Sequence, residues 1–280
     1  MKAICVAAAA SVAVTMLAGC QNGQPSASAA VASAPSASSA TATTAATGPS
    51  KPMGDGSVWT YVVSDAAGKP VEVGVRMTGA ALRGLPADMP EGHPVPVILK
   101  FPSGTATGVL NHVEFYWNPM GHEPPGVWDT PHFDYHFFIA DEATAREVNP
   151  NNANFATRAN RVPDVKYMPG DFAPPPGTAV SNTVPLMGLH WADTTVTRTP
   201  GKYDFTQEMI RGSWNGNVTF IEPMITREWL LSHTPLDHQL SEPQAYQRSG
   251  LYPTTYTVHY DAASDEYSIA LGGFTDRTAS

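Results

Sequence analysis

The sequence predicts an all-β domain, mainly antiparallel, built as a sandwich or a barrel with short helices and long Pro/Gly-rich loops. Short runs of β-branched and aromatic residues alternate with Pro and Gly, which number 26 and 23 among the 280 residues. Long stretches with a period of 3.6 residues are nearly absent. One Asn-Gly pair, at positions 215 and 216, separates two apolar runs and is a strong signal for a hairpin.

The chain begins with an expected export signal. Lys2 precedes an apolar run from Ala3 to Leu17, which ends in Leu17-Ala18-Gly19-Cys20. The run is shorter than the roughly 20 residues of a spanning helix, and it has the positive start and small-residue cleavage site of a signal peptide. This segment resembles the lipobox of bacterial lipoproteins, which implies a signal peptide over residues 1–20 and lipidation at Cys20. The alternative is an ordinary secretory signal in which Cys20 is incidental.

Gln21, where retained lipoproteins have Asp, implies by the same resemblance a protein exported to the cell envelope, lipid-anchored in the outer membrane and facing the periplasm. Residues 21–56 are Ala, Ser, Thr, Pro and Gly with almost no large apolar side chain, so we expect a disordered tether. Residues 57–280 then form a single β domain. Both cysteines, Cys5 and Cys20, lie in the signal segment, so this domain is expected to contain no disulfide and no cysteine ligand.

The formal charge of −9 makes nucleic acid and anionic lipid surfaces poor partners, because both require clustered Lys and Arg. Membrane contact is therefore expected through the N-terminal lipid alone. A small-molecule ligand is compatible with the composition, and the oligomeric state is left open.

The expected elements follow in order along the domain. Three hairpins are expected, formed by residues 58–64 with 70–77, 207–214 with 218–225, and 252–260 with 266–274. Three further strands are expected between the first and second hairpins, at residues 95–101, 112–117 and 132–138. Asp141 is expected to cap a short helix that extends through Val148, and Thr226 one that extends through Leu231. Residues 149–177, rich in Asn and Pro, are expected to form a long irregular excursion.

Residues 132–136 read His-Phe-Asp-Tyr-His and are the clearest chemical feature of the chain. In a strand His132, Asp134 and His136 share one face, while Phe133 and Tyr135 cover the other. Four strand steps of roughly 3.3 Å separate His132 from His136 by about 13 Å, so one ion can take Asp134 and only one of the two histidines. A helical alternative, with the histidines one turn apart, fits the aromatic alternation poorly.

Further metal ligands must then come from elsewhere, and the candidates are His122, His190 and Glu222. A carboxylate in the apolar run around Glu222 is rarely buried unless it is paired or bound to a cation. Glu114 is expected near Asp134 and His136 if residues 112–117 and 132–138 pair antiparallel. Glu222 or Glu114 is the candidate catalytic base.

Histidines with one or two carboxylates suit a divalent metal such as Zn, Fe, Mn or Ni. Met120 and Met187, next to two of the candidate histidines, raise Cu as a further metal, although such methionines are more often core filler. Three functions remain open: binding of a divalent metal or small ligand, metal-dependent hydrolysis or oxygen chemistry, and a non-catalytic envelope binding or assembly role with a structural histidine network.

Three segments resemble an uncharacterised family of secreted bacterial proteins, a domain of unknown function. They are residues 118–138, with GHEPPG and PHFDYHF, residues 188–193, GLHWAD, and residues 220–226, FIEPMIT. The resemblance spans about Val58 to Phe274 and implies the domain boundary but no activity. Gly126, six positions before His132, gives a looser similarity to cupins, which implies a metal-binding β-barrel. Asp at position 134 and the lack of a following glutamate restrict that similarity to architecture.

Overall fold

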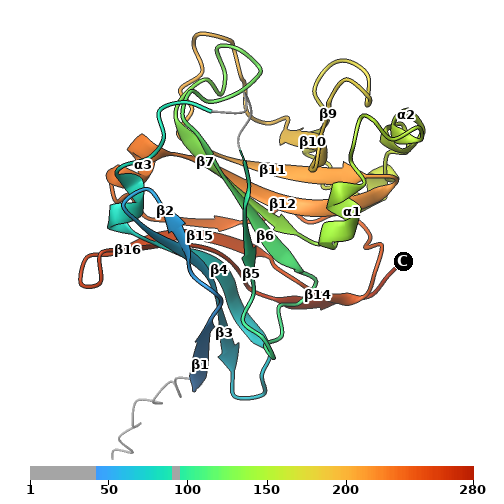
Figure 1. The fold of residues 1–280 in the computed structure, drawn as a ribbon. Helices are drawn as coiled ribbons and strands as arrows, with labels where there is room; N and C mark the ends of the chain where they lie inside the picture. Colours follow the sequence, from blue (N-terminus) through green and yellow to red (C-terminus); the bar gives the residue numbers. More distant parts are fainter. Residues whose placement is uncertain (1–41, 90–94) are drawn as a thin grey trace, which may run out of the picture. The chain divides into compact units, whose positions relative to one another are not determined.

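The structure is a computed structural model that describes residues 42–89 and 95–280. The described residues form β-strands, loops and three short helices, α1 (Glu142–Arg146), α2 (Phe155–Ala159) and α3 (Arg227–Leu231) (Figure 1). Among them no helix is long and apolar enough to cross a membrane. The predicted signal peptide and the lipidation site Cys20 lie outside the described residues.

The strands form two large antiparallel sheets and one small pair. The first sheet has the order β1-β3-β4-β16-β15-β13, with β2 beside β3. Its strands are β1 (Thr43–Thr47), β2 (Lys51–Met53), β3 (Gly56–Asp65), β4 (Pro70–Thr78), β13 (Leu236–Gln239), β15 (Thr255–Asp261) and β16 (Glu266–Gly272).

The second sheet has the order β5-β6-β7-β12-β11-β10-β8, with β9 beside β10. Its strands are β5 (Val97–Lys100), β6 (His112–Asn118), β7 (His132–Phe138), β8 (Phe172–Ala173), β9 (Thr183–Val184), β10 (Gly188–Asp193), β11 (Gln207–Trp214) and β12 (Asn217–Thr226). The small pair is β14 (Gly250–Tyr252) with β17 (Thr275–Arg277).

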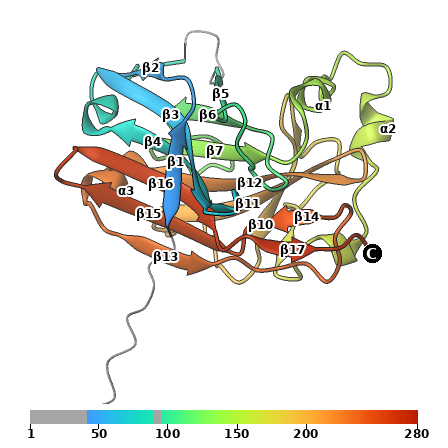
Figure 2. The same cartoon turned by 90° about the horizontal axis from the view of Figure 1, so that it is seen from below.

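The two large sheets pack against each other through a shared apolar core (Figures 1 and 2). Val62 and Val75 of the first sheet belong to the same buried cluster as Phe115, Phe133 and Ile221 of the second. Burial of these side chains is the main stabilising contribution to such a fold, at roughly 25 cal/mol per Å² of apolar surface. The predicted all-β, antiparallel sandwich is confirmed. The described strands form open sheets rather than a closed barrel, so the barrel alternative is wrong.

The local signals that predicted turns and helix starts are confirmed. Asn215 and Gly216 have φ angles of 49° and 82°, the double positive φ of a type I′ turn, and they join β11 to β12. The carboxylate of Asp141 accepts a hydrogen bond from the Thr144 N–H at the start of α1, at 2.8 Å. The Thr226 hydroxyl caps α3 in the same way.

Several boundaries differ from the prediction, and the helix expected to extend through Val148 ends at Arg146. The domain begins before residue 57, since β1 and β2 pair with β3. These strands need no large apolar side chains because they are held by backbone hydrogen bonds at a sheet edge, which the composition argument for a tether overlooked. The strand expected over 95–101 is shorter, Val97–Lys100. The last hairpin starts at Thr255, because Tyr252 belongs to β14, and the excursion 149–177 contains α2 and β8.

Candidate metal centre

The face of the second sheet that points away from the sandwich core is polar at its centre and yet buried. On β7, Phe133 and Tyr135 enter the core, while His132, Asp134 and His136 lie on the opposite face with exposures of 0%, 3% and 0%. A second apolar cluster packs on this outer face and includes Trp128 and Phe205 from the loops above it. The strand pattern predicted the two faces, but it did not predict the apolar cluster that covers the polar one.

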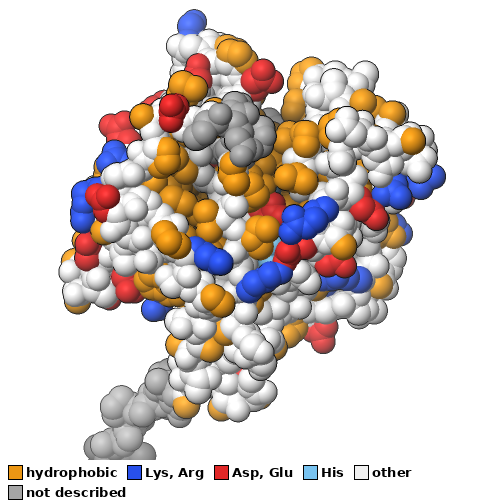
Figure 3. Space-filling view, in the orientation of Figure 1, with side chains coloured by type: hydrophobic (Ala, Val, Ile, Leu, Met, Phe, Trp, Pro, Cys, Tyr) orange, Lys and Arg blue, Asp and Glu red, His pale blue; other side chains and the backbone are white. Residues whose placement is uncertain are grey.

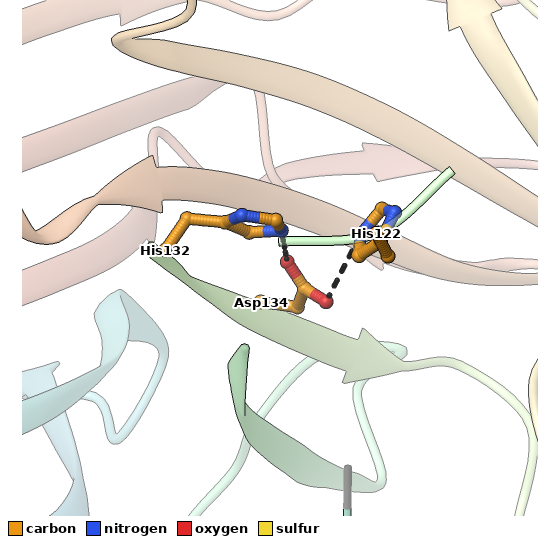
Figure 4. Close-up of side chains that lie close together, drawn as sticks. All are labelled: His122, His132 and Asp134. Atoms are coloured by element: carbon orange, nitrogen blue, oxygen red, sulfur yellow. Dashed lines mark ion pairs between the residues drawn. The ribbon is translucent and has the colours of Figure 1, made fainter. Parts of the chain in front are cut away.

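His122, His132 and Asp134 form a first triad, in which one possible ligand atom from each residue lies within 4.8 Å of the others. The His132 Nε2 is 3.1 Å from Asp134 Oδ1, and the His122 Nε2 is 3.6 Å from Asp134 Oδ2. Figure 4 shows both imidazole rings directed toward the carboxylate, with two residues on β7 and His122 on the preceding loop. That loop is fixed by a backbone bridge between His122 and Trp128.

His136, His190 and Glu222 form a second triad of the same composition and tightness. The Glu222 Oε2 is 3.3 Å from His136 Nε2 and 3.5 Å from His190 Nε2. The three residues come from β7, β10 and β12. All six predicted metal residues are therefore brought together, three in each triad. His132 and His136 belong to different triads, as the strand spacing requires.

Gly212 lies beside the second triad, whose residues come from strands that are not all neighbours. His190 on β10 lies opposite Gly212 on β11, and β11 separates β10 from β12. A Cβ at position 212 would overlap the ring of Phe220, which in turn contacts the rings of His136 and His190. The bare backbone of β11 at Gly212 therefore leaves room for the Phe220 ring, which packs against both histidines of the second triad. Sequence reasoning did not identify this residue, although a glycine inside a strand is a known sign of close approach.

The ring nitrogens of three histidines are oriented for ligation through Nε2. His132 Nδ1 lies 2.7 Å from the Thr130 carbonyl oxygen, His122 Nδ1 2.9 Å from that of Glu123, and His190 Nδ1 3.2 Å from that of Gly188. A ring that donates Nδ1–H to a carbonyl presents the Nε2 lone pair to the triad, which is the usual second interaction of a metal-bound histidine. Asn118 similarly donates to Asp134 Oδ2 at 2.8 Å.

Several triad atoms are buried without a hydrogen-bond partner among the described residues: His132 Nε2, Asp134 Oδ1, His136 Nε2 and Glu222 Oε2. Buried polar groups are normally paired, because an unpaired one costs on the order of 1–3 kcal/mol. The distances from histidine Nε2 to carboxylate oxygen within the triads, 3.1–3.6 Å, are close to the spacing of about 3.3–3.4 Å between ligands of a tetrahedral ion with bonds of about 2.0–2.1 Å. The residues fit a divalent metal ion.

The first triad keeps its carboxylate ionised. Burial alone would raise the pKa of Asp134, but His132 and His122 hold it well below its usual range. Burial opposes protonation of His122, while the hydrogen bond and charge of Asp134 raise its pKa above the usual value. In the absence of a metal, an ionised carboxylate therefore lies between the two histidine rings of this triad.

The second triad is electrically different. Burial lowers the pKa of His136 to about 3 and that of His190 to about 4. Burial also raises the pKa of Glu222 well above its usual value, and the negative charges of Asp134 and Glu208 add to this effect. Without a cation, Glu222 therefore tends to keep its proton between two neutral histidines. A metal ion would displace that proton.

Glu114 lies opposite His136 in the β6–β7 pair, but its carboxylate belongs to neither triad. It accepts a hydrogen bond of 2.7 Å from the Tyr116 hydroxyl and lies 3.6 Å from His112. Glu222 occupies a ligand position rather than a free base position. His112 Nδ1 lies 3.0 Å from Asn111 Oδ1, and His112 belongs to neither triad.

Solvent reaches the two triads unequally. The side chains of His122 and His190 are 36% and 19% exposed, while those of His132 and His136 are fully buried. The triads are neighbours along β7, where Asp134 and His136 are two residues, or about 6.6 Å, apart. The arrangement resembles a pair of three-ligand sites reached from the His122 and His190 side.

Comparison with known proteins gives little additional information. A family model described as "TTHB210-like: Hypothetical protein TTHB210" matches residues 65–117. No curated protein matches the chain, and no solved structure matches it. The matched segment covers β4 to β6, ends before the segments on which the resemblance to secreted bacterial proteins rests, and contains none of the six triad residues.

Proposed function

We propose that this protein is an envelope protein that binds divalent metal ions, one in each of the two triads of its β domain. The observation that carries the proposal is the division of six His and carboxylate residues into two sets, each with convergent ligand atoms that lack other partners among the described residues. A set of two histidines and one carboxylate is typical of Zn and non-haem Fe(II) sites. The lipobox at Leu17–Cys20 supports a lipid anchor in the outer membrane.

Metal analysis of protein purified without a His-tag tests this proposal. After chelation and reloading with Zn, Fe, Mn or Ni in turn, the wild type is expected to bind two ions per chain of the preferred metal. His132→Ala and His136→Ala are each expected to bind one, because each removes a ligand from a different triad. Asp237→Asn is a matched control, since that residue is exposed on β13. Wild-type protein that retains no stoichiometric metal would refute the proposal.

Metal-dependent hydrolysis is a second candidate, supported by the number of ligands and by their exposure. Three protein ligands leave a fourth position of a tetrahedral ion for water, and the exposed sides of His122 and His190 give a route to it. The assay is cleavage of ester, phosphodiester and peptide substrates before and after chelation. Hydrolysis that survives both chelation and the His136→Ala change would contradict this candidate. The predicted lipidation is tested by mass spectrometry of Cys20 in the native host.

A further inference from the structure

A cavity of about 600 Å³ lies on the opposite face of β11 and β12 from the triads. Arg211, Thr219 and Ile221 line it from these two strands, and none of the six triad residues does. The segment around Tyr246 and Tyr252 closes another side. Its volume is within the range of small-molecule sites, about 300–1,000 Å³.

Arg211 is the unusual residue of this cavity, because it is a buried cation without an ion pair among the described residues. Its side chain is largely buried, with 8% exposure, and one Nη donates to the Ser241 carbonyl at 3.1 Å. Its Nε–H has no acceptor within residues 42–89 and 95–280. Burial lowers the pKa of Arg211 to about 10, although the charge of Asp171 raises it, and Arg211 stays charged at neutral pH. The guanidinium also lies over the Phe172 ring, 5.6 Å from its centroid, while Asp171 accepts a hydrogen bond from the Ser241 hydroxyl and forms no ion pair with Arg211 among the described residues. A buried charge is normally paired or bound to a ligand.

Thr219 is a second unpaired group in the same cavity. It is 2% exposed, and its hydroxyl has no hydrogen-bond partner among the described residues. The two acidic residues in the lining are already engaged, since Asp141 caps α1 and Glu242 pairs with Arg277. Neither is therefore a free counter-ion for Arg211.

The apolar residues of the lining indicate the second feature that a ligand of this cavity must have. Ile139, Val218 and Ile221 contribute aliphatic surface, and the tyrosines contribute aromatic surface. A ligand that fits must then carry an anionic group for Arg211 and an apolar body. The planar edge of a guanidinium matches a carboxylate, which accepts two parallel N–H bonds.

We propose that the Arg211 cavity is a binding site for a small carboxylate with an apolar or aromatic body, with Arg211 as the anion-binding residue and Thr219 as an additional donor. The site is independent of the metal centre, because its residues face the other side of the sheet. The two proposals can therefore fail separately.

Ligand-observed NMR on the full chain tests this inference, with benzoate, phenylacetate and hexanoate as probes. Their neutral amides are the matched control ligands, and inorganic phosphate is a second anion. Chelator is present throughout, so that a carboxylate held by a metal is not counted. The carboxylates are expected to bind, and the amides to bind at least about ten-fold more weakly, since loss of a charge-assisted hydrogen bond costs about that factor or more. Phosphate is expected not to compete, because it has no apolar body to contact the aliphatic and aromatic lining.

Variants assign the binding to this cavity. Arg211→Met is expected to abolish binding and Thr219→Val to weaken it several-fold, whereas Arg76→Gln, which removes an arginine from the other sheet, leaves it unchanged. If Arg211→Met does not fold, the isosteric Thr219→Val change still gives the answer. The proposal would be overturned if no carboxylate bound, or if acids and amides bound equally well. It would also be overturned if both cavity variants still bound the carboxylates, or if phosphate were preferred.

Discussion

Replacing Glu222 with Gln is expected to stabilise the metal-free protein at neutral pH and to remove metal binding at the second triad. Burial raises the pKa of Glu222 well above its usual value of 4.5. The folded protein therefore retains a proton that the unfolded chain releases once the pH exceeds 4.5. This group's contribution to stability is fully present below pH 4.5 and is lost as the pH rises through the folded-state pKa.

The size of the effect follows from proton linkage. Between pH 4.5 and the raised pKa, one such proton lowers the free energy of unfolding by about 1.4 kcal/mol per pH unit. Glutamine does not titrate, so the free energy of unfolding of Glu222→Gln is expected to rise relative to that of the wild type by this amount for each pH unit. Contributions from the other titrating groups are nearly common to both proteins and largely cancel in the difference. Saturating metal is expected to reduce this difference, because the second triad of the wild type alone binds the ion, and a ligand at 100 times its Kd stabilises by about 2.7 kcal/mol.

The assay is urea unfolding of chelated wild type and variant at pH 5, 6, 7 and 8, repeated with excess metal. Glu228→Gln is the matched control, because this glutamate is exposed at the start of α3. The account of the buried carboxylate would be refuted if the difference in free energy of unfolding between wild type and Glu222→Gln were the same at pH 5 and at pH 6. Equal stabilisation of the two proteins by metal would refute its role as a ligand.

Two further substitutions test the support of each triad separately. Asn118→Ala is expected to weaken metal binding at the first triad about 10- to 100-fold by removing the hydrogen bond to Asp134, with the second triad unaffected in a competition titration. Gly212→Ala is expected to displace the ring of Phe220, and with it His190. Calorimetry of metal binding should then show loss of the second site alone, and unchanged binding of two ions would contradict this role for Gly212.

Much of the site was accessible from sequence because strand geometry is regular. The alternation in residues 132–138 assigned Asp134 to the polar face, and the 13 Å span of four residues separated His132 from His136. Glu222 stood out because a carboxylate in an apolar run needs a partner. The extended sheet order could not be inferred, since nothing local specifies that β7 pairs with β12 rather than with β10.

The assignment of His122 and His190 to their triads also depended on long-range packing. His122 is positioned by a loop that is anchored through Trp128, whose indole N–H donates to Glu208, 80 residues further along the chain. His190 lies opposite Gly212, which leaves room for the Phe220 ring that packs against His190. Such contacts leave no periodic pattern in the sequence.

The central claim is that the chain holds two metal ions in separate triads, and anomalous X-ray scattering from metal-loaded crystals tests it most directly. The account predicts two peaks per chain. One lies among the Nε2 atoms of His122 and His132 and the Asp134 carboxylate, and the other lies among His136, His190 and Glu222. The account would be contradicted if crystals soaked in saturating metal showed no peak at either triad, or showed a single peak shared by Asp134 and His136.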